Sequence, residues 1–275
     1  MTIKDILVGL ATREEADPGR DLALAMAAKY KAHVTAAAYA LTPDLPFSIY
    51  PEFVSGLAQQ IRAEADQAVE AARGRFEQAA RSAGVEHTFK KESCPVQFAA
   101  SNFAYRLRTA DLGILTQHKS DELERFGDVF MESALFHSGR PLIMVPRNFQ
   151  RSFSADRVLI AWDASIHATR AVAASAPLMA AGATIEVFTV EEASKGSEFR
   201  GSALVQHLRR HGLDAGLAQR RASDVPEAIL REVAAFRATL IIMGGYGHSR
   251  FRQFVFGGAT RLMLSEMPVP VLMAH

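Results

Sequence analysis

Two groups of glycines stand near the end of the chain: Met243-Gly244-Gly245-Tyr246-Gly247 and, after nine intervening residues, Gly257-Gly258-Ala259-Thr260. The apolar run 239–243 predicts a buried strand before the first group, and the residues after Thr260 predict the start of a helix. Glycine at a strand end lets the backbone approach a ligand closely. Backbone N–H groups at a helix N-terminus bind anions with the help of the helix dipole. This spacing therefore predicts a phosphate-binding site.

The glycines belong to the second of two similar halves. Each half begins with a short apolar strand, continues through an Ala-rich helix and a second strand, and closes on a proline-led apolar strand. The matched segments are first strands 3–9 and 156–161, helices 19–31 and 168–181, second strands 32–39 and 183–190, later strands 110–115 and 238–243, and last strands 140–146 and 269–274. Alternating strands and helices predict parallel sheets covered on both faces. We expect two tandem flavodoxin-like α/β domains with five-stranded parallel sheets, at 1–147 and 155–275.

Composition narrows the classes of function. The 275 residues fit two average domains, and the net charge of +1 gives no basic stripe for nucleic acid. The single cysteine, Cys94, excludes an internal disulfide and suits a reducing compartment. It is expected to be a small structural residue rather than a redox-sensing thiol. The sequence shows neither a signal peptide nor a long uncharged apolar run, so we expect a cytoplasmic protein without a membrane span.

The first half carries an insertion at 41–61 that contains Pro43, Pro46 and Pro51. A charged helix is predicted to follow it at 62–83. The insertion is either a packed surface loop or a lid or partner-binding loop, because long ordered loops in compact domains are often functional.

The motifs of the second half resemble those of a known family. The pattern Gly-x2-Gly-x9-Gly is similar to the signature of the ATP-binding branch of the universal stress protein family. Trp162-Asp163-Ala164-Ser165, followed by Ala168, resembles the Asp-x-Ser-x-x-Ala sequence that ends the family's first strand. The resemblance extends over nearly the whole chain, as a tandem two-domain member. It implies binding of ATP or another adenine nucleotide, with or without Mg²⁺, in a regulatory or stress-response protein.

The resemblance also implies roles for single residues. Asp163 would contact the adenosine, although aspartate is equally a favoured helix N-cap, and Val190 would pack on the adenine. The phosphate cradle would be formed by Gly244, Gly247, Gly257, Gly258 and Thr260. Flanking candidates are Ala161, Trp162, Met243, Gly245, His248, Ser249, Arg250 and Ala259. Gly258 departs from the family pattern, because many ATP-binding relatives have Ser or Thr there, and its lack of a hydroxyl is expected to weaken binding.

The first half lacks these motifs. Its counterparts of the two glycine groups are Thr116-Gln117-His118-Lys119-Ser120 and Gly127-Asp128-Val129-Phe130-Met131, and its first strand ends without an aspartate. A carboxylate at a helix N-terminus would repel phosphate. We therefore predict one nucleotide per chain, bound in the second half. The resemblance further implies that segments 141–145 and 269–274 pair, as an intramolecular pseudo-dimer that leaves further homodimerisation open.

Other sites fit the sequence less well. The chain has no Gly-x4-Gly-Lys-Ser/Thr loop, and the glycines follow a late strand instead of opening the first βα turn of a Rossmann domain. His207 and His211 have zinc-binding spacing but no third ligand nearby, which favours a solvated helix face. No catalytic set is evident. The rival functions are a slow Mg²⁺-dependent ATP hydrolase that uses Asp163 or Ser249, and a nucleotide-free interaction scaffold.

Overall fold

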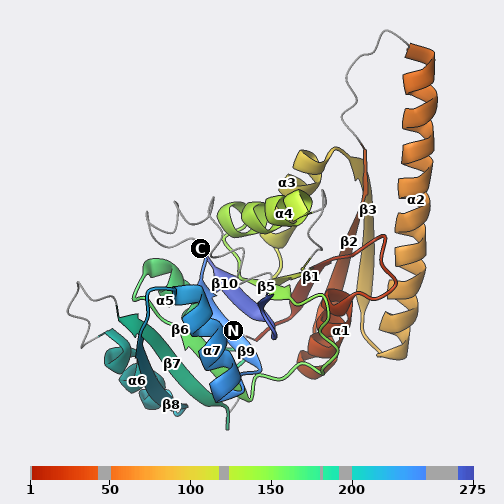
Figure 1. The fold of residues 1–275 in the computed structure, drawn as a ribbon. Coiled ribbons are helices and arrows are strands. Elements are labelled where there is room, and N and C mark those ends of the chain that lie inside the picture. The colour runs from red at the N-terminus through yellow and green to blue at the C-terminus, as the bar shows by residue number, and fades with distance from the viewer. Residues whose placement is uncertain (1, 43–50, 118–123, 180–181, 192–199, 246–265) are drawn as a thin grey trace. The chain divides into compact units, whose positions relative to one another are not determined.

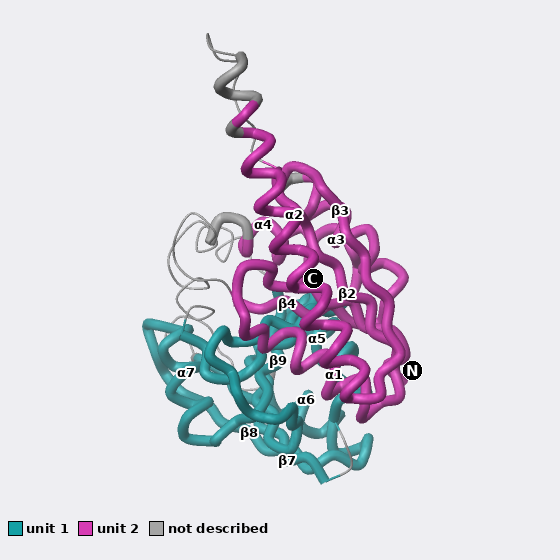
Figure 2. Tube along the Cα trace, turned by 90° about the vertical axis from the view of Figure 1, so that its right-hand side faces the viewer, with its two compact units in different colours: residues 1, 141–275 teal, residues 2–140 magenta. Residues whose placement is uncertain are grey.

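The computed structural model describes residues 2–42, 51–117, 124–179, 182–191, 200–245 and 266–275. These residues form two compact units, an N-terminal unit at 2–140 and a C-terminal unit at 141–275 (Figure 2). In both units apolar strands alternate with helices, as the sequence pattern predicts (Figure 1). No helix within the described residues is long and apolar enough to cross a membrane.

The N-terminal unit is built on a parallel sheet with strand order β3-β2-β1-β4. Its elements are β1 (Asp5–Gly9), α1 (Pro18–Tyr30), β2 (His33–Leu41), α2 (Pro51–Ser82), β3 (His87–Cys94), α3 (Val96–Leu107), β4 (Leu112–Thr116) and α4 (Glu124–His137). Helices α1 and α2 cover one face of this sheet, and α3 and α4 cover the other (Figure 1). Strand β4 is buried along its whole length.

The C-terminal unit has strand order β5-β10-β9-β6-β7-β8. Its elements are β5 (Leu142–Val145), β6 (Arg157–Ala161), α5 (Ile166–Ser175), β7 (Thr184–Glu191), α6 (Arg200–Arg210), β8 (Asp214–Arg221), α7 (Val225–Phe236), β9 (Leu240–Gly244) and β10 (Val271–Ala274). All neighbouring strands in this unit are parallel except β5 and β10, which are antiparallel, with Met144 opposite Val271. The strand pairing expected for 141–145 and 269–274 is therefore present.

Two helix boundaries differ from the sequence-based expectation. Helix α2 begins at Pro51 and not at residue 62, so much of the predicted insertion loop is helical. Proline suits the first turn of a helix, where its missing N–H costs nothing. Helix α5 ends at Ser175, earlier than the expected residue 181. Strand β5 belongs to the C-terminal unit because it pairs with β10, whereas the domain boundaries 1–147 and 155–275 stay a prediction.

Candidate functional site

The carboxyl ends of β6 and β9 form the switch point of the C-terminal sheet. From β6 the chain passes through α5 to β7 on one side, and from β8 it passes through α7 to β9 on the other side. Ala161 and Met243, which stand at or next to the ends of these strands, lie opposite each other. In open parallel sheets, ligands bind beyond the carboxyl ends of the strands at such a reversal. Those of the residues selected from the sequence that the structure describes lie at this edge.

Asp163 lies in the short turn between β6 and α5. One carboxylate oxygen accepts the backbone N–H of Ser165 at 2.9 Å, which makes an Asx turn. The intervening Ala164 has a φ of 61°, a left-handed conformation that is uncommon outside glycine. The N-cap of α5 is Ser165, whose hydroxyl accepts the Ala168 N–H at 3.0 Å. The capping role considered for Asp163 thus belongs to Ser165, and Asp163 instead fixes the turn before the helix.

Gly244 brings the end of β9 against the first turn of α5. A β-carbon placed on Gly244 would lie 2.6 Å from the backbone nitrogen of Ala168 and 3.0 Å from the carbonyl carbon of His167. Real β-carbons do not approach backbone this closely, so only glycine fits the present spacing. Its φ is not in the positive range, and the requirement for glycine here is steric. The strand end, the Asp163 turn and the start of a helix therefore share one corner.

The neighbouring strand β7 forms the other side of the edge. Trp162 donates its backbone N–H to the carbonyl oxygen of Phe188 at 2.8 Å, which ties the chain after β6 to β7. Val190 follows two residues further along β7 and is half-buried. Its side chain stands near the carboxyl end of β7, where the family resemblance would place the adenine base.

The remaining candidates cannot be placed. They lie outside the described residues and are Gly247, His248, Ser249, Arg250, Gly257, Gly258, Ala259 and Thr260. The structure therefore brings together Ala161, Trp162, Asp163, Val190, Met243, Gly244 and Gly245 and leaves the second glycine group as a prediction.

The strand register relates these positions to the N-terminal unit. Gly9 ends β1 as Ala161 ends β6, and each is paired with both neighbouring strands. Gly9 is paired with Leu115 and Ala161 with Met243, so the next residue of each strand, Thr116 and Gly244, occupies the equivalent position in the two units. In the same way, Tyr39 takes the place of Val190.

At the equivalent edge of the N-terminal unit, a carboxylate of the chain itself occupies the helix start. Asp17 is the N-cap of α1 and only 3% exposed. Its carboxylate accepts the backbone N–H groups of Ala11 at 2.9 Å and Arg20 at 3.1 Å. It also accepts the Thr116 hydroxyl at 2.7 Å, and the same hydroxyl oxygen accepts the Gly19 N–H at 2.9 Å. An internal anion thus takes up donors of the kind that bind phosphate at a helix N-terminus.

Aromatic side chains fill the other part of this edge. The ring of Tyr39 packs edge-on against Phe130 of α4, with ring centroids 5.4 Å apart. Burial, followed by the charge of Glu92, raises the pKa of the Tyr39 hydroxyl. The sequence-based reason for a closed first half was different: it placed Asp128 at a helix start. The structure corrects this, because α4 begins at Glu124 and Asp128 lies in its second turn.

The sequence patterns did not select Asp17, Gly19, His167 or His275. Asp17-Pro18 is a recognisable helix start, since Asp is a favoured N-cap and Pro a favoured first helical residue. Its contact with Thr116 joins residues 99 positions apart and has no local signal. The stack of His167 on His275 likewise depends on tertiary structure.

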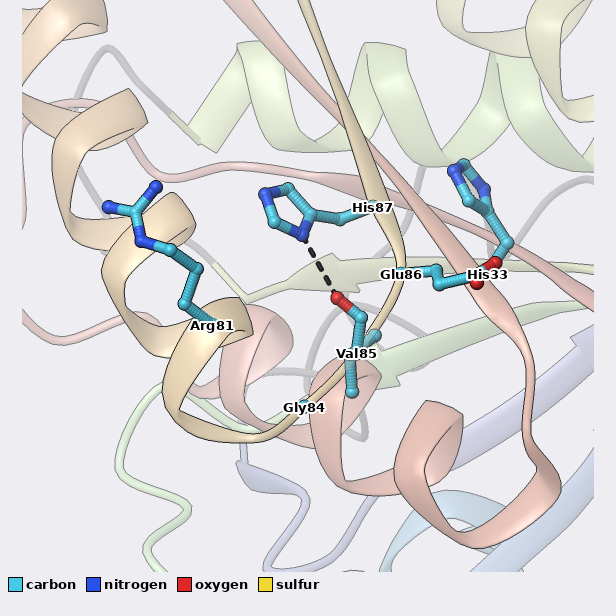
Figure 3. Close-up of a pocket in the computed structure, with 6 residues that line it drawn as sticks. All are labelled: His33, Arg81, Gly84, Val85, Glu86 and His87. Carbon is cyan, nitrogen blue, oxygen red and sulfur yellow. Dashed lines mark hydrogen bonds between the residues drawn. The ribbon is translucent and has the colours of Figure 1, made fainter.

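A shallow hollow lies at the opposite edge of the N-terminal unit. It measures about 520 Å³ and lies where α2 ends and where β2 and β3 begin (Figure 3). His87 is held there by a 3.0 Å hydrogen bond between its Nδ1 and the Val85 carbonyl oxygen. The lining residues are His33, Arg81, Gly84, Val85, Glu86 and His87. None of them is a residue that the sequence motifs select, so the hollow adds nothing to the candidate site.

Metal binding finds no support in the described part of the chain. No group of three His, Cys, Asp or Glu side chains there could hold an ion. His207 and His211 lie on α6 with their rings in edge contact, 4.7 Å apart.

Comparison with known proteins gives the chain a family context. Residues 205–275 match the model of the universal stress protein family. A search of curated proteins found no match. A universal stress protein from Archaeoglobus fulgidus DSM 4304 has a similar structure, with a TM-score of 0.76 and 14% identity over 99% of this chain and 96% of that one.

A protein of unknown function from Pseudomonas aeruginosa PAO1 is also similar, with a TM-score of 0.58 and 14% identity over 98% of this chain and 92% of that one. At such identities the structural likeness establishes the fold. The family match of this chain is therefore to the universal stress protein family at residues 205–275, and the whole chain has the flavodoxin-like fold of its structural neighbours in an arrangement consistent with two tandem domains.

Proposed function

We propose that the protein binds ATP or another adenine nucleotide through its C-terminal half, residues 155–275, and acts as a regulatory or stress-response protein. The observation that carries this proposal is the contact of Gly244 with the first turn of α5, beside the Asp163 turn. Glycine at this strand end lets β9 lie against the first turn of a helix, where the helix dipole favours negative charge.

The chemistry of the edge suits a nucleotide. Asp163 offers a carboxylate that can accept a hydrogen bond from the nucleoside, and Val190 offers an apolar surface near the end of the adjacent strand. In the proposal Gly244, Gly247, Gly257, Gly258 and Thr260 hold the phosphates through backbone and hydroxyl donors. Any Mg²⁺ would enter the site bound to the phosphates of the nucleotide.

The N-terminal half is proposed to bind no nucleotide. The Asp17 carboxylate and the Thr116 hydroxyl already satisfy one another and the N–H groups at the start of α1. Phosphate would have to displace a buried, hydrogen-bonded carboxylate and would meet its charge. The expected stoichiometry is therefore one nucleotide per chain.

The nucleotide content of the purified protein tests this function. The protein is purified without added nucleotide, extracted with acid, and the extract is separated by chromatography. Bound ATP would support a nucleotide-binding protein, and bound ADP would support an ATP hydrolase. An extract without nucleotide would support an interaction scaffold. Calorimetric titration with ATP then gives the stoichiometry, for which two equivalent sites per chain would contradict the proposed asymmetry.

A further inference from the structure

Two histidines meet beside the first glycines of the proposed site. His275 follows β10, and His167 is the second residue of α5. Their rings are stacked, with centroids 4.1 Å apart and ring planes inclined by 27°. The first turn of α5 that carries His167 is also the turn against which Gly244 packs. The ends of β9 and β10 and the start of α5 therefore touch at one point.

The ring of His275 also holds the peptide group of Gly245. Its Nδ1 lies 3.1 Å from the Gly245 carbonyl oxygen. Because a carbonyl oxygen can only accept, Nδ1 carries the hydrogen and donates it. The N–H of Gly245 in turn donates to the carbonyl oxygen of Ala274 at 2.8 Å. Gly245, which follows the last residue of β9, is thus fixed at both its nitrogen and its oxygen by the end of β10.

The other half of the chain lacks both histidines at the matching positions. His167 and Gly19 each stand two residues after the N-cap of the first helix of their half. His275 and Pro146 each follow directly the last strand of their half. Glycine has no ring to stack, and proline has no side-chain donor. The histidine pair therefore occurs only in the half that carries the glycine motif.

We propose that His275 is a positioning residue of the nucleotide site. Its Nδ1–H fixes the orientation of the Gly245 peptide group directly after β9, and the stack on His167 lies beside this hydrogen bond. This inference rests on the proposed function. His275 acts through the backbone of the loop and needs no contact with the nucleotide.

Three substitutions separate the hydrogen bond from the stack. His275→Asn keeps an N–H donor near the position of Nδ1 and removes the ring. His275→Phe keeps the ring and removes the donor, and His275→Ala removes both. Loss of one neutral hydrogen bond that orients a binding loop corresponds to roughly three- to tenfold in affinity. His211→Ala breaks a histidine contact on α6, away from the site, and serves as the control.

Calorimetric titration with ATP and thermal unfolding are measured on the full chain for every variant. We expect ATP affinity within about twofold of the native value for His275→Asn and His211→Ala, and a loss of roughly three- to tenfold for His275→Phe and His275→Ala. When the variants are ranked by their loss of ATP affinity, the ranking should differ from their ranking by melting temperature. Native affinity in His275→Phe, or affinity losses that follow the melting temperatures, would overturn the proposal.

The carbonyl ¹³C resonance of Gly245 reports the hydrogen bond without any nucleotide. It should move upfield in His275→Phe and His275→Ala and stay near its native position in His275→Asn. A native resonance in His275→Phe would show that the bond is absent in solution and would overturn the proposal by itself. A native protein that binds no ATP, but shows these shifts, would instead overturn the proposed function and with it the role of His275 in binding.

Discussion

Gly244 and Ala168 lie so close together that a β-carbon on Gly244 would stand 2.6 Å from the backbone nitrogen of Ala168. In the N-terminal unit the close contact is reversed: a β-carbon on Gly19, in the helix, would stand 2.5 Å from the Thr116 hydroxyl oxygen at the strand end. Each unit joins a strand end to a helix start through one glycine. Only the C-terminal unit places that glycine on the strand.

Gly244→Ala should weaken both the fold and nucleotide binding. The new methyl group must push the start of α5 away from β9, and overpacking of this kind costs about 1–3 kcal/mol of unfolding free energy. Denaturant unfolding measures the stability, and calorimetry with ATP measures the binding. Gly74→Ala is the matched control, because Gly74 lies in α2 with nothing within 4 Å of its β-carbon position.

The control should stabilise the protein by about 0.5–1 kcal/mol, because alanine is the better helix former. Native stability and native ATP affinity in Gly244→Ala would show that the close contact with α5 does not constrain this position.

Asp163→Ala should weaken ATP and adenosine alike. The carboxylate is proposed to accept a hydrogen bond from the nucleoside, a contact present in both ligands and worth about 1.5–3 kcal/mol when one partner is charged. Asp163→Asn keeps an oxygen that can accept the Ser165 N–H and isolates the effect of charge. Titrations with adenosine and with Mg-ATP give the result. If Asp163→Ala kept its adenosine affinity but lost Mg-ATP affinity, Asp163 would be a Mg²⁺ ligand, and an ATP hydrolase would be the favoured function.

Asp17→Ala should destabilise the N-terminal unit by about 2–3 kcal/mol, because it removes a cap and leaves buried donors unsatisfied. Those donors are the N–H groups of Ala11 and Arg20 and the hydroxyl of Thr116. Asp224, the exposed N-cap of α7, is the comparison, and Asp224→Ala should cost only about 1 kcal/mol. Chemical denaturation gives both values, and equal losses would mean that the Thr116 contact adds nothing to capping.

Glu186→Gln should raise the melting temperature near neutral pH by a few degrees. Burial, followed by the charge of Glu232, raises the pKa of Glu186. One of its carboxylate oxygens is buried without a hydrogen-bond partner among the described residues, and Glu232 of α7 is paired with Arg220. Because the folded pKa exceeds the unfolded one, the stability that protonation provides is present in full below the ordinary pKa of about 4.3 and is lost as pH rises through the raised value.

Glutamine has no charge to bury, so its advantage should be largest at pH 7–8 and should vanish near pH 4. Melting curves across this range provide the measurement. Glu227→Gln changes an exposed carboxylate on α7, the helix that carries Glu232, and should leave the melting temperature unchanged. A pH-independent difference between Glu186→Gln and the native protein would contradict the burial argument.

Local patterns predicted most of the fold, and tertiary contacts account for what they missed. The apolar runs located β1, β6 and β9, because buried strands need continuous apolar residues. The pairing of β5 with β10 was expected from the family resemblance and not from the pattern of residues. The Asp163 turn was located as well, but its cap was not, since Asp163 and Ser165 are both good capping residues two positions apart. No local sequence pattern links Asp17 to Thr116 or His167 to His275. These two contacts lie at the carboxyl ends of the strands, one in each unit.

Because β5 belongs to the C-terminal unit, the two units can fold only in a certain order during translation. Residues 2–140 form their own compact unit and can pack as they leave the ribosome. Met144 of β5 must wait for Val271 of β10, the last strand that the structure describes. Until then an apolar strand with all four residues buried in the final fold lacks this partner along one edge, and open strand edges of this kind associate with other chains. A ribosome that stalls between the two strands would release a nascent chain prone to aggregation through residues 142–145.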